Sequence, residues 1–167
     1  MTATSTEIAF QGVRVRFDSA KSYGDVVAAL LADVGDKPVP VNDFAARFER
    51  WEDYEREVQS HVGPSGFMLF GSFDHGSWIK KTGIDREVLR VVIGNPLIAI
   101  TMIRHDVTAG LFAPVELLIA EEEGDRSSLT YVVPSSLMVV EENEPLREAA
   151  LGLDAKLAAL AAQVTAA

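Results

Sequence analysis

The chain has 167 residues, of which 48% are hydrophobic and 24% are charged, so we expect one soluble globular domain with a substantial core. Its formal net charge of −10 repels phosphate backbones and anionic membrane surfaces, and no basic stripe offsets it, which excludes nucleic acid as a partner. The absence of cysteine excludes disulfides, thiolate metal sites and cysteine nucleophiles.

No targeting or membrane signal is found in the sequence. The first ten residues lack the basic and apolar regions of a signal peptide. The longest apolar run is bracketed by Arg90 and Arg104 and is too short to span a bilayer. We therefore expect a cytoplasmic protein without membrane association.

The N-terminal part predicts a strand followed by a helix. Residues 8–17 alternate between apolar and polar side chains, which indicates a strand with one face in solvent. Ser22 is a candidate N-cap, and Asp25 in the first turn favours the helix dipole. Apolar residues at helical spacing then predict a helix that ends near Gly35.

Residues 37–65 predict a stiff linker and a second helix. The helix is expected to be capped by Asn42 and to run to about His61. Its apolar side chains repeat at helical spacing and are mostly aromatic: Phe44, Phe48, Trp51, Tyr54 and Val58. This stripe either packs on the core of its own domain or serves as a lid, a dimer contact or an interaction surface.

The middle of the chain predicts two inner strands and a short helix. Residues 67–73 form the first strand, which ends at Asp74-His75-Gly76, and residues 88–93 form the second. Gly94 allows a tight turn, Asn95 caps, and Pro96 suits the first helical position. The β-branched run over 97–105 also fits a strand, but the Asn-Pro start favours a helix.

The C-terminal part predicts a hairpin and a long helix. Strands over 115–122 and 127–133 flank a turn at 123–126. Residues 143–164 then carry a regular apolar stripe. With long helices at both ends of a run of strands, the order of elements predicts a single α+β domain over 1–167, with one mainly antiparallel sheet and the long helices on one face.

Five features in order resemble the bacterial family called domain of unknown function 302. They are the strand end at 73–75, LRVVIGNP at 89–96, GLFAP at 110–114, the strand and acidic hairpin over 115–123, and YVVP at 131–134. The resemblance implies a β-α-β4-α domain of the TATA-binding-protein-like or helix-grip type, often dimeric, and it implies no reaction. The segment 37–65 and the long C-terminal helix depart from the family pattern.

Two candidate site regions follow. His75 next to Asp74 at a strand end could act as a general acid or base, or could simply tie the strand end to a loop. The helix start at Gly94-Asn95-Pro96 could face an anion, or could be a plain turn and cap. If both regions converge at one rim of the sheet, they form a better pocket than either does alone.

The preferred function is binding of a small apolar or anionic ligand, or of a partner, in a cleft between the sheet and the long helix, by a homodimer. Asp74, His75, Gly94 and Asn95 would line its polar end, and its walls would be aromatic: Phe48, Trp51 and Trp78. One alternative is an enzyme that uses His75 with Asn95 or the helix start. Another is an interaction module that uses the 42–61 helix. We expect no metal and no cofactor, because the histidines lack metal-motif spacing and no phosphate-binding glycine loop is present.

Overall fold

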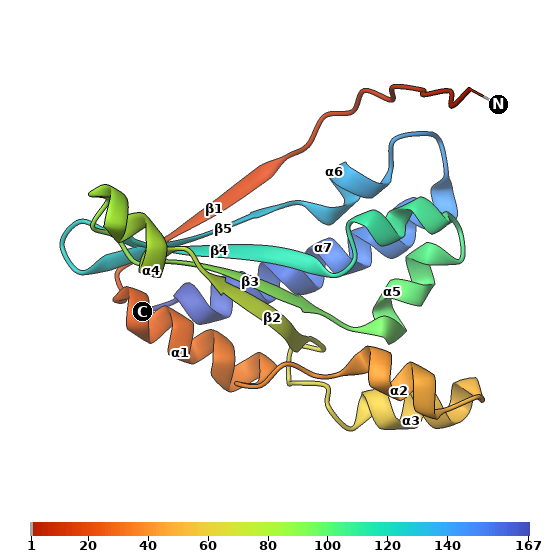
Figure 1. The fold of residues 1–167 in the computed structure, drawn as a ribbon, viewed down its shortest axis with the longest axis horizontal. Coiled ribbons are helices and arrows are strands. Elements are labelled where there is room, and N and C mark those ends of the chain that lie inside the picture. The colour runs from red at the N-terminus through yellow and green to blue at the C-terminus, as the bar shows by residue number, and fades with distance from the viewer. Residues whose placement is uncertain (1) are drawn as a thin grey trace.

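The computed structural model describes residues 2–167, and its centre is one five-stranded sheet (Figure 1). The strand order is β1-β5-β4-β3-β2, and all four neighbouring pairs are antiparallel. The strands are β1 (Arg14–Ser19), β2 (Met68–Asp74), β3 (Val88–Gly94), β4 (Val115–Glu122) and β5 (Arg126–Val132). The α+β class and the antiparallel sheet predicted from the sequence are confirmed.

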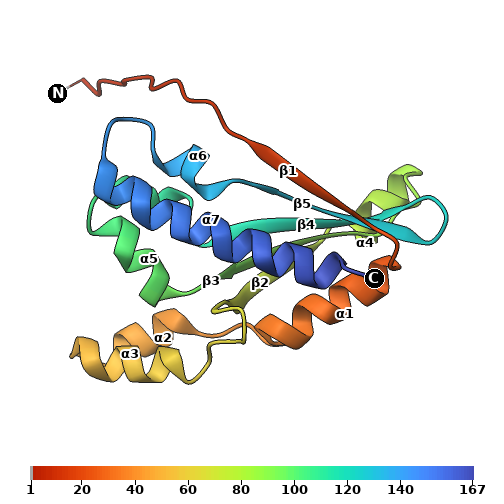
Figure 2. The same ribbon diagram turned by 180° about the vertical axis from the view of Figure 1, so that it is seen from behind.

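The helices leave one face of this sheet uncovered. They are α1 (Tyr23–Val34), α2 (Val41–Arg47), α3 (Trp51–Gln59), α4 (Gly76–Ile79), α5 (Pro96–Ile103), α6 (Pro134–Met138) and α7 (Glu144–Thr165), with short 3-10 turns η1 (Lys80–Thr82) and η2 (Val107–Leu111). Figure 1 looks onto the uncovered face, with α7 passing behind the strands, and Figure 2 shows α7 in front of them. Burial along β4 agrees, since Val115, Leu117 and Ile119 are buried whereas Glu116 and Leu118 are exposed.

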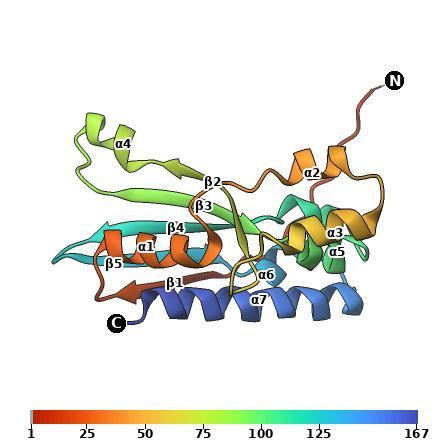
Figure 3. The same cartoon turned by 90° about the horizontal axis from the view of Figure 1, so that it is seen from below.

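The core lies between the sheet and the two long helices. Figure 3 shows α1 and α7 running along the sheet. The apolar stripe predicted for the long helix is buried at every position: Leu146, Ala150, Leu153, Leu157, Leu160 and Val164. Burial of an amphipathic face of this length is the main source of stability for such a helix.

Two helix starts follow the predicted capping chemistry. The Ser22 side chain accepts a hydrogen bond from the Asp25 backbone N–H at 3.1 Å, and Gly35 is the C-cap of α1. The Asn95 side chain accepts from the Leu97 backbone N–H at 2.8 Å, with Pro96 in the first turn of α5. The choice of helix over strand for this β-branched segment is therefore confirmed.

Two predicted boundaries are wrong. β1 begins at Arg14 rather than at Ile8, because β5 ends at Val132 and leaves the preceding residues no strand to pair with. The helix predicted over 42–61 is two helices, α2 and α3, because the backbone is extended at Phe48. α2 starts at Val41, so Asn42 lies inside its first turn and is not the cap.

Glu122 joins three basic or polar groups at the hairpin end of the sheet. It accepts a hydrogen bond from the Ser128 hydroxyl at 2.7 Å and pairs with Arg16 at 3.2 Å and Arg86 at 3.0 Å. The Ser128 hydrogen bond, aided by Arg86 and Arg16, lowers the pKa of Glu122 below its usual value, against the opposing effect of burial.

This lowered pKa predicts a contribution to acid sensitivity. A carboxyl with a lower pKa in the folded state stabilises that state above its unfolded pKa, and this contribution is lost as the pH falls through the folded pKa. We expect Glu122→Gln to lose less stability than the wild type between about pH 5 and pH 2, in urea titrations at each pH. Equal acid slopes in the two proteins would contradict this role.

Candidate functional site

A hollow of about 240 Å³ lies at the end of the sheet where β3 runs into α5. Figure 1 shows α2, α3 and α5 grouped near this end of β3. The lining is mostly apolar: Val41, Asn42, Tyr54, Phe67, Phe70, Gly94, Asn95, Pro96, Ile98, Ala99, Met102, Ala113, Pro114, Val115 and Leu153. We call this hollow the end pocket. The sequence predicted a cleft between the sheet and the long helix, but Leu153 is the only lining residue from α7.

Gly94 lets an aromatic ring form one wall of the end pocket. A Cβ atom at this position would lie 2.7 Å from the Phe70 ring and 3.0 Å from Cβ of Pro114. Real Cβ atoms do not approach other atoms as closely as the first of these distances. The Phe70 ring therefore packs directly against the backbone at the end of β3, and glycine is required there for close approach rather than for an unusual backbone angle.

Asn95 shapes the end pocket through hydrogen bonds to the protein. It is 8% exposed, its side-chain oxygen accepts from the Leu97 backbone N–H, and its Nδ2 donates to the Gly66 carbonyl at 2.9 Å. The first bond caps α5 and the second fixes the loop before β2. The side chain predicted to bind a ligand thus makes two structural hydrogen bonds. Asn95 lines the end pocket, but both polar atoms of its side chain are already engaged within the protein.

Removing those bonds is expected to destabilise the fold. Asn95→Ala would lose the cap of α5 and leave the partly buried Gly66 carbonyl without its donor, for a loss of about 1–3 kcal/mol. Urea unfolding at neutral pH measures this difference. Ser22→Ala is the control, because it removes an N-cap hydrogen bond that is exposed to solvent. It should lower the free energy of unfolding by less, about 1 kcal/mol.

Tyr54 offers the polar group that Asn95 does not. Its ring lines the end pocket, and burial raises the pKa of its hydroxyl, so the group stays protonated at neutral pH. The side-chain hydrogen bonds of α3 involve Glu52, Asp53, Arg56 and Glu57, and none among residues 2–167 involves the Tyr54 hydroxyl. The sequence analysis counted Tyr54 only as part of an apolar stripe, although its phenol was the signal that could have identified it.

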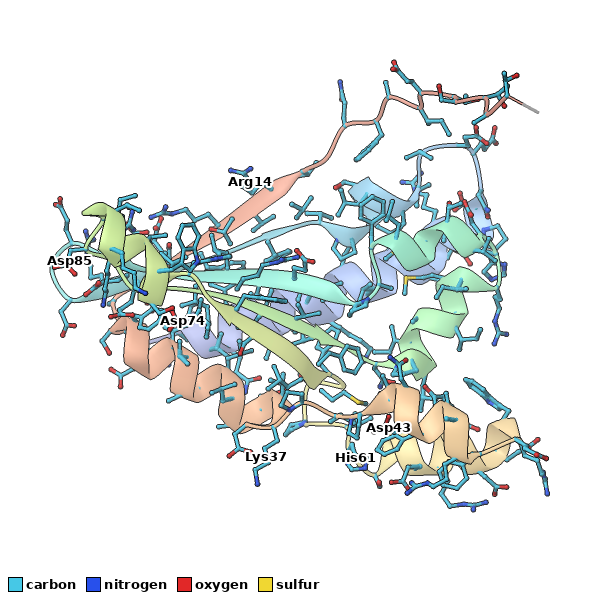
Figure 4. All side chains as sticks on the ribbon, in the orientation of Figure 1. Arg14, Lys37, Asp43, His61, Asp74 and Asp85 are labelled. Atoms are coloured by element: carbon cyan, nitrogen blue, oxygen red, sulfur yellow. The ribbon has the colours of Figure 1, made fainter. Side chains whose placement is uncertain are left out.

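Asp74 and His75 lie at the opposite end of the sheet from Asn95. In the register of β2 and β3, Asp74 pairs with Leu89 whereas Met68 pairs with Gly94, so about 20 Å of strand separates the two ends. Figure 4 shows Asp74 beside α4, away from Asp43 on α2. The convergence expected at one rim is therefore wrong, because β2 and β3 are antiparallel neighbours and the end of one lies beside the start of the other.

At that far end, the side chains of Asp74 and His75 form hydrogen bonds with residues a few positions along the chain. The Asp74 carboxylate accepts from the Ser77 backbone N–H at 3.0 Å, which ties the end of β2 to the first turn of α4. His75 is half-buried, and its Nδ1 accepts from the Trp78 indole N–H at 3.3 Å. Neither residue lines the end pocket. This placement favours the structural interpretation of His75. It excludes the hypothesis of an enzyme in which His75 and Asn95 act on one substrate.

The predicted aromatic residues also divide between the two ends. Trp51 is 45% exposed, with its ring centre 5.7 Å from that of Tyr54, so it lies next to the end pocket without lining it. Phe48 lies under the Arg47 guanidinium at 4.6 Å, and Trp78 is at the far end with His75. Most of the stripe over 44–58 packs on a small second core around Phe44, Val58 and Met68.

Metal-binding clusters and membrane-spanning helices are both absent from residues 2–167. Among residues 2–167, no group of three or more His, Asp or Glu side chains is arranged to hold a metal ion. Within the same residues, no helix has both the length and the apolar character needed to cross a membrane.

Comparisons with known proteins agree with this fold. The model of the family described as "Domain of unknown function DUF302" matches residues 44–164, a range that includes α3 and the whole end-pocket region of β3 and α5. A crystal structure of an uncharacterized conserved DUF302 protein from Bacillus stearothermophilus has a TM-score of 0.62 and 16% identity, and the alignment covers 90% of this chain and 97% of that one. The search of curated proteins found no match. The resemblance seen in the sequence is confirmed, and the chain belongs to the DUF302 family.

Proposed function

We propose that this protein binds a small, largely apolar, uncharged ligand in the end pocket. The observation that supports this most directly is the lining: it is mostly apolar and includes the Tyr54 phenol, whose hydroxyl has no hydrogen-bond partner among residues 2–167. Binding sites for small molecules are commonly apolar hollows with a few polar groups that orient the ligand. The hollow exceeds the roughly 150 Å³ of a buried cavity that holds benzene, so a one- or two-ring compound fits.

The charge of the lining narrows the ligand class. The sequence analysis allowed an apolar or an anionic ligand, but no lysine or arginine lines the end pocket. A buried anion without a cation or several donors is costly to desolvate. A neutral ligand that accepts one hydrogen bond from the Tyr54 hydroxyl therefore fits the lining better than an anion does.

Binding can be tested with neutral aromatic probes. We expect 4-ethylphenol or indole at millimolar concentration to raise the melting temperature, because a ligand that binds only the folded state stabilises it. Calorimetry then gives the dissociation constant. Tyr54→Phe should weaken binding of 4-ethylphenol about three- to tenfold, the usual value of one neutral hydrogen bond.

Matched variants on α5 provide the control. Ala99→Leu adds three carbon atoms inside the end pocket and should abolish probe binding, whereas Thr101→Leu on the exposed side of the same helix should leave it unchanged. If no probe shifts the melting temperature of the wild type, or if Ala99→Leu binds as the wild type does, the proposal is wrong.

The ligand proposal does not rest on the homodimer expected from the sequence. That homodimer stays a prediction here, separate from the end pocket.

A further inference from the structure

A second hollow, of about 370 Å³, lies at the same end of the sheet as the end pocket. Its lining comes from the η2 turn, the segment that leads into β4, the end of β5 and α6, which Figure 1 shows close together. Most of the lining side chains are apolar, among them Leu111, Phe112, Val132 and Leu137. We call this hollow the side groove.

The side groove and the end pocket adjoin each other. Pro114 and Val115, at the start of β4, line both hollows. Neither hollow is enclosed, and Pro114 is itself exposed. An apolar chain that leaves the end pocket therefore has an apolar path over Pro114 into the side groove.

The size of the end pocket indicates that it holds only part of a ligand. Sites for small molecules commonly have volumes of about 300–1,000 Å³. The end pocket, at about 240 Å³, is below this range, and the side groove adds about 370 Å³. The two hollows together fall within the range, so the space fits a molecule longer than a ring.

The chemistry of the side groove favours an uncharged, apolar occupant. Within residues 2–167, Glu116 is the one charged residue that lines it, and the Arg90 Nε already donates to that carboxylate at 3.0 Å. Leu111 is 79% exposed beside the groove. Exposed apolar surface at a hollow is typical of a ligand-binding groove, because a bound ligand removes that surface from water.

The N-terminal arm, residues 2–13, borders the side groove. Figures 1 and 2 show the arm leaving β1 beside α6. A Cβ atom at Gly12 would lie 3.6 Å from Val132 and 3.7 Å from Leu137, and the ring centre of Phe10 lies 6.2 Å from that of Phe112. A chain in the side groove is therefore flanked by the arm as well as by the η2 turn.

We propose that the ligand is an uncharged amphiphile, with a ring-sized polar head in the end pocket and an apolar tail in the side groove. The head accepts the hydrogen bond of the Tyr54 hydroxyl, and the tail passes over Pro114 and covers Leu111 and Phe112. This inference rests on the ligand binding proposed above and names the class of that ligand.

The first test compares two phenols that have the same head and different tails. Calorimetry gives the dissociation constants of 4-ethylphenol and of 4-heptylphenol, which has the longer chain. Each methylene group taken out of water raises affinity about threefold, so burial of about three of them predicts that 4-heptylphenol binds roughly thirtyfold more tightly. If 4-ethylphenol binds and 4-heptylphenol binds no more tightly, this inference is wrong and the end pocket remains a ligand site. If neither phenol binds, the proposed function itself fails.

The second test uses two glutamate variants on the η2 turn to locate the tail. Leu111 lines the side groove, whereas Val107, which is 78% exposed, lines neither hollow. Leu111→Glu should weaken binding of 4-heptylphenol about tenfold, because it places a carboxylate against the apolar tail, and should leave binding of 4-ethylphenol unchanged. Val107→Glu should change neither dissociation constant. Equal dissociation constants of the two variants for 4-heptylphenol would overturn the side groove as the site of the tail.

Discussion

Phe67→Ala is expected to lower the free energy of unfolding by about 3–5 kcal/mol, the usual cost of removing a fully buried phenyl ring. Phe67 is 0% exposed, belongs to the main core, and also lines the end pocket. Removing its ring therefore leaves a cavity that joins an existing hollow, and the surrounding side chains cannot close it by small shifts.

Urea unfolding followed by circular dichroism measures this loss, and the midpoint is expected to move without a change in slope. Phe10→Ala is the matched control: Phe10 is 49% exposed, touches only the edge of the Phe112 ring among aromatic side chains, and should cost about 1 kcal/mol or less. The enlarged end pocket of a folded Phe67→Ala protein should bind naphthalene more tightly than the wild type does. A loss below about 1 kcal/mol would contradict the assigned position of Phe67 in the core.

Gly63→Ala is expected to be the second severe substitution, with a loss of about 3 kcal/mol or more, at or above the upper end of ordinary overpacking. A Cβ atom at position 63 would lie 2.0 Å from the carbonyl oxygen of Asp33 and 2.9 Å from that of Phe67. Both obstacles are backbone atoms. The Gly63 N–H also donates to the Phe67 carbonyl at 2.8 Å, so the loop cannot move away without breaking that bond.

Gly71→Ala is the control for this prediction. Among residues 2–167, no atom other than those of its chain neighbours lies within 4 Å of a Cβ at position 71, and its backbone has an ordinary negative φ. Alanine there is expected to change stability by less than about 1 kcal/mol and can increase it, because alanine restricts the unfolded chain. Equal stability of the Gly63→Ala and Gly71→Ala proteins in the same urea assay would contradict a backbone contact at position 63.

Local chemistry explains why so many elements could be predicted from the sequence. Ser22 and Asn95 cap their helices as expected, and the stripe of α7 is buried from Leu146 to Val164. Capping bonds and amphipathic periodicity involve residues a few positions apart, so the sequence contains the complete signal. The break at Phe48 was missed because the ring packs under Arg47 and on a second small core, which the helical spacing alone does not reveal.

The candidate site depended on contacts between distant segments. Whether His75 and Asn95 meet depends on the direction of β2 relative to β3, and the antiparallel register separates them. The end pocket combines residues from 41 to 153, and its phenol and its glycine wall become visible only once Tyr54, Phe70 and Gly94 are placed together.

The sequence by itself determined most of the order of the elements, the caps of α1 and α5, the α+β class and the membership of the DUF302 family. Only the tertiary structure decided which ends of the strands meet, which side chains line the end pocket, and which face of the sheet is uncovered. The physical reason is that capping and periodicity act within a few residues, whereas a pocket or an uncovered face results from the packing of segments far apart in the chain.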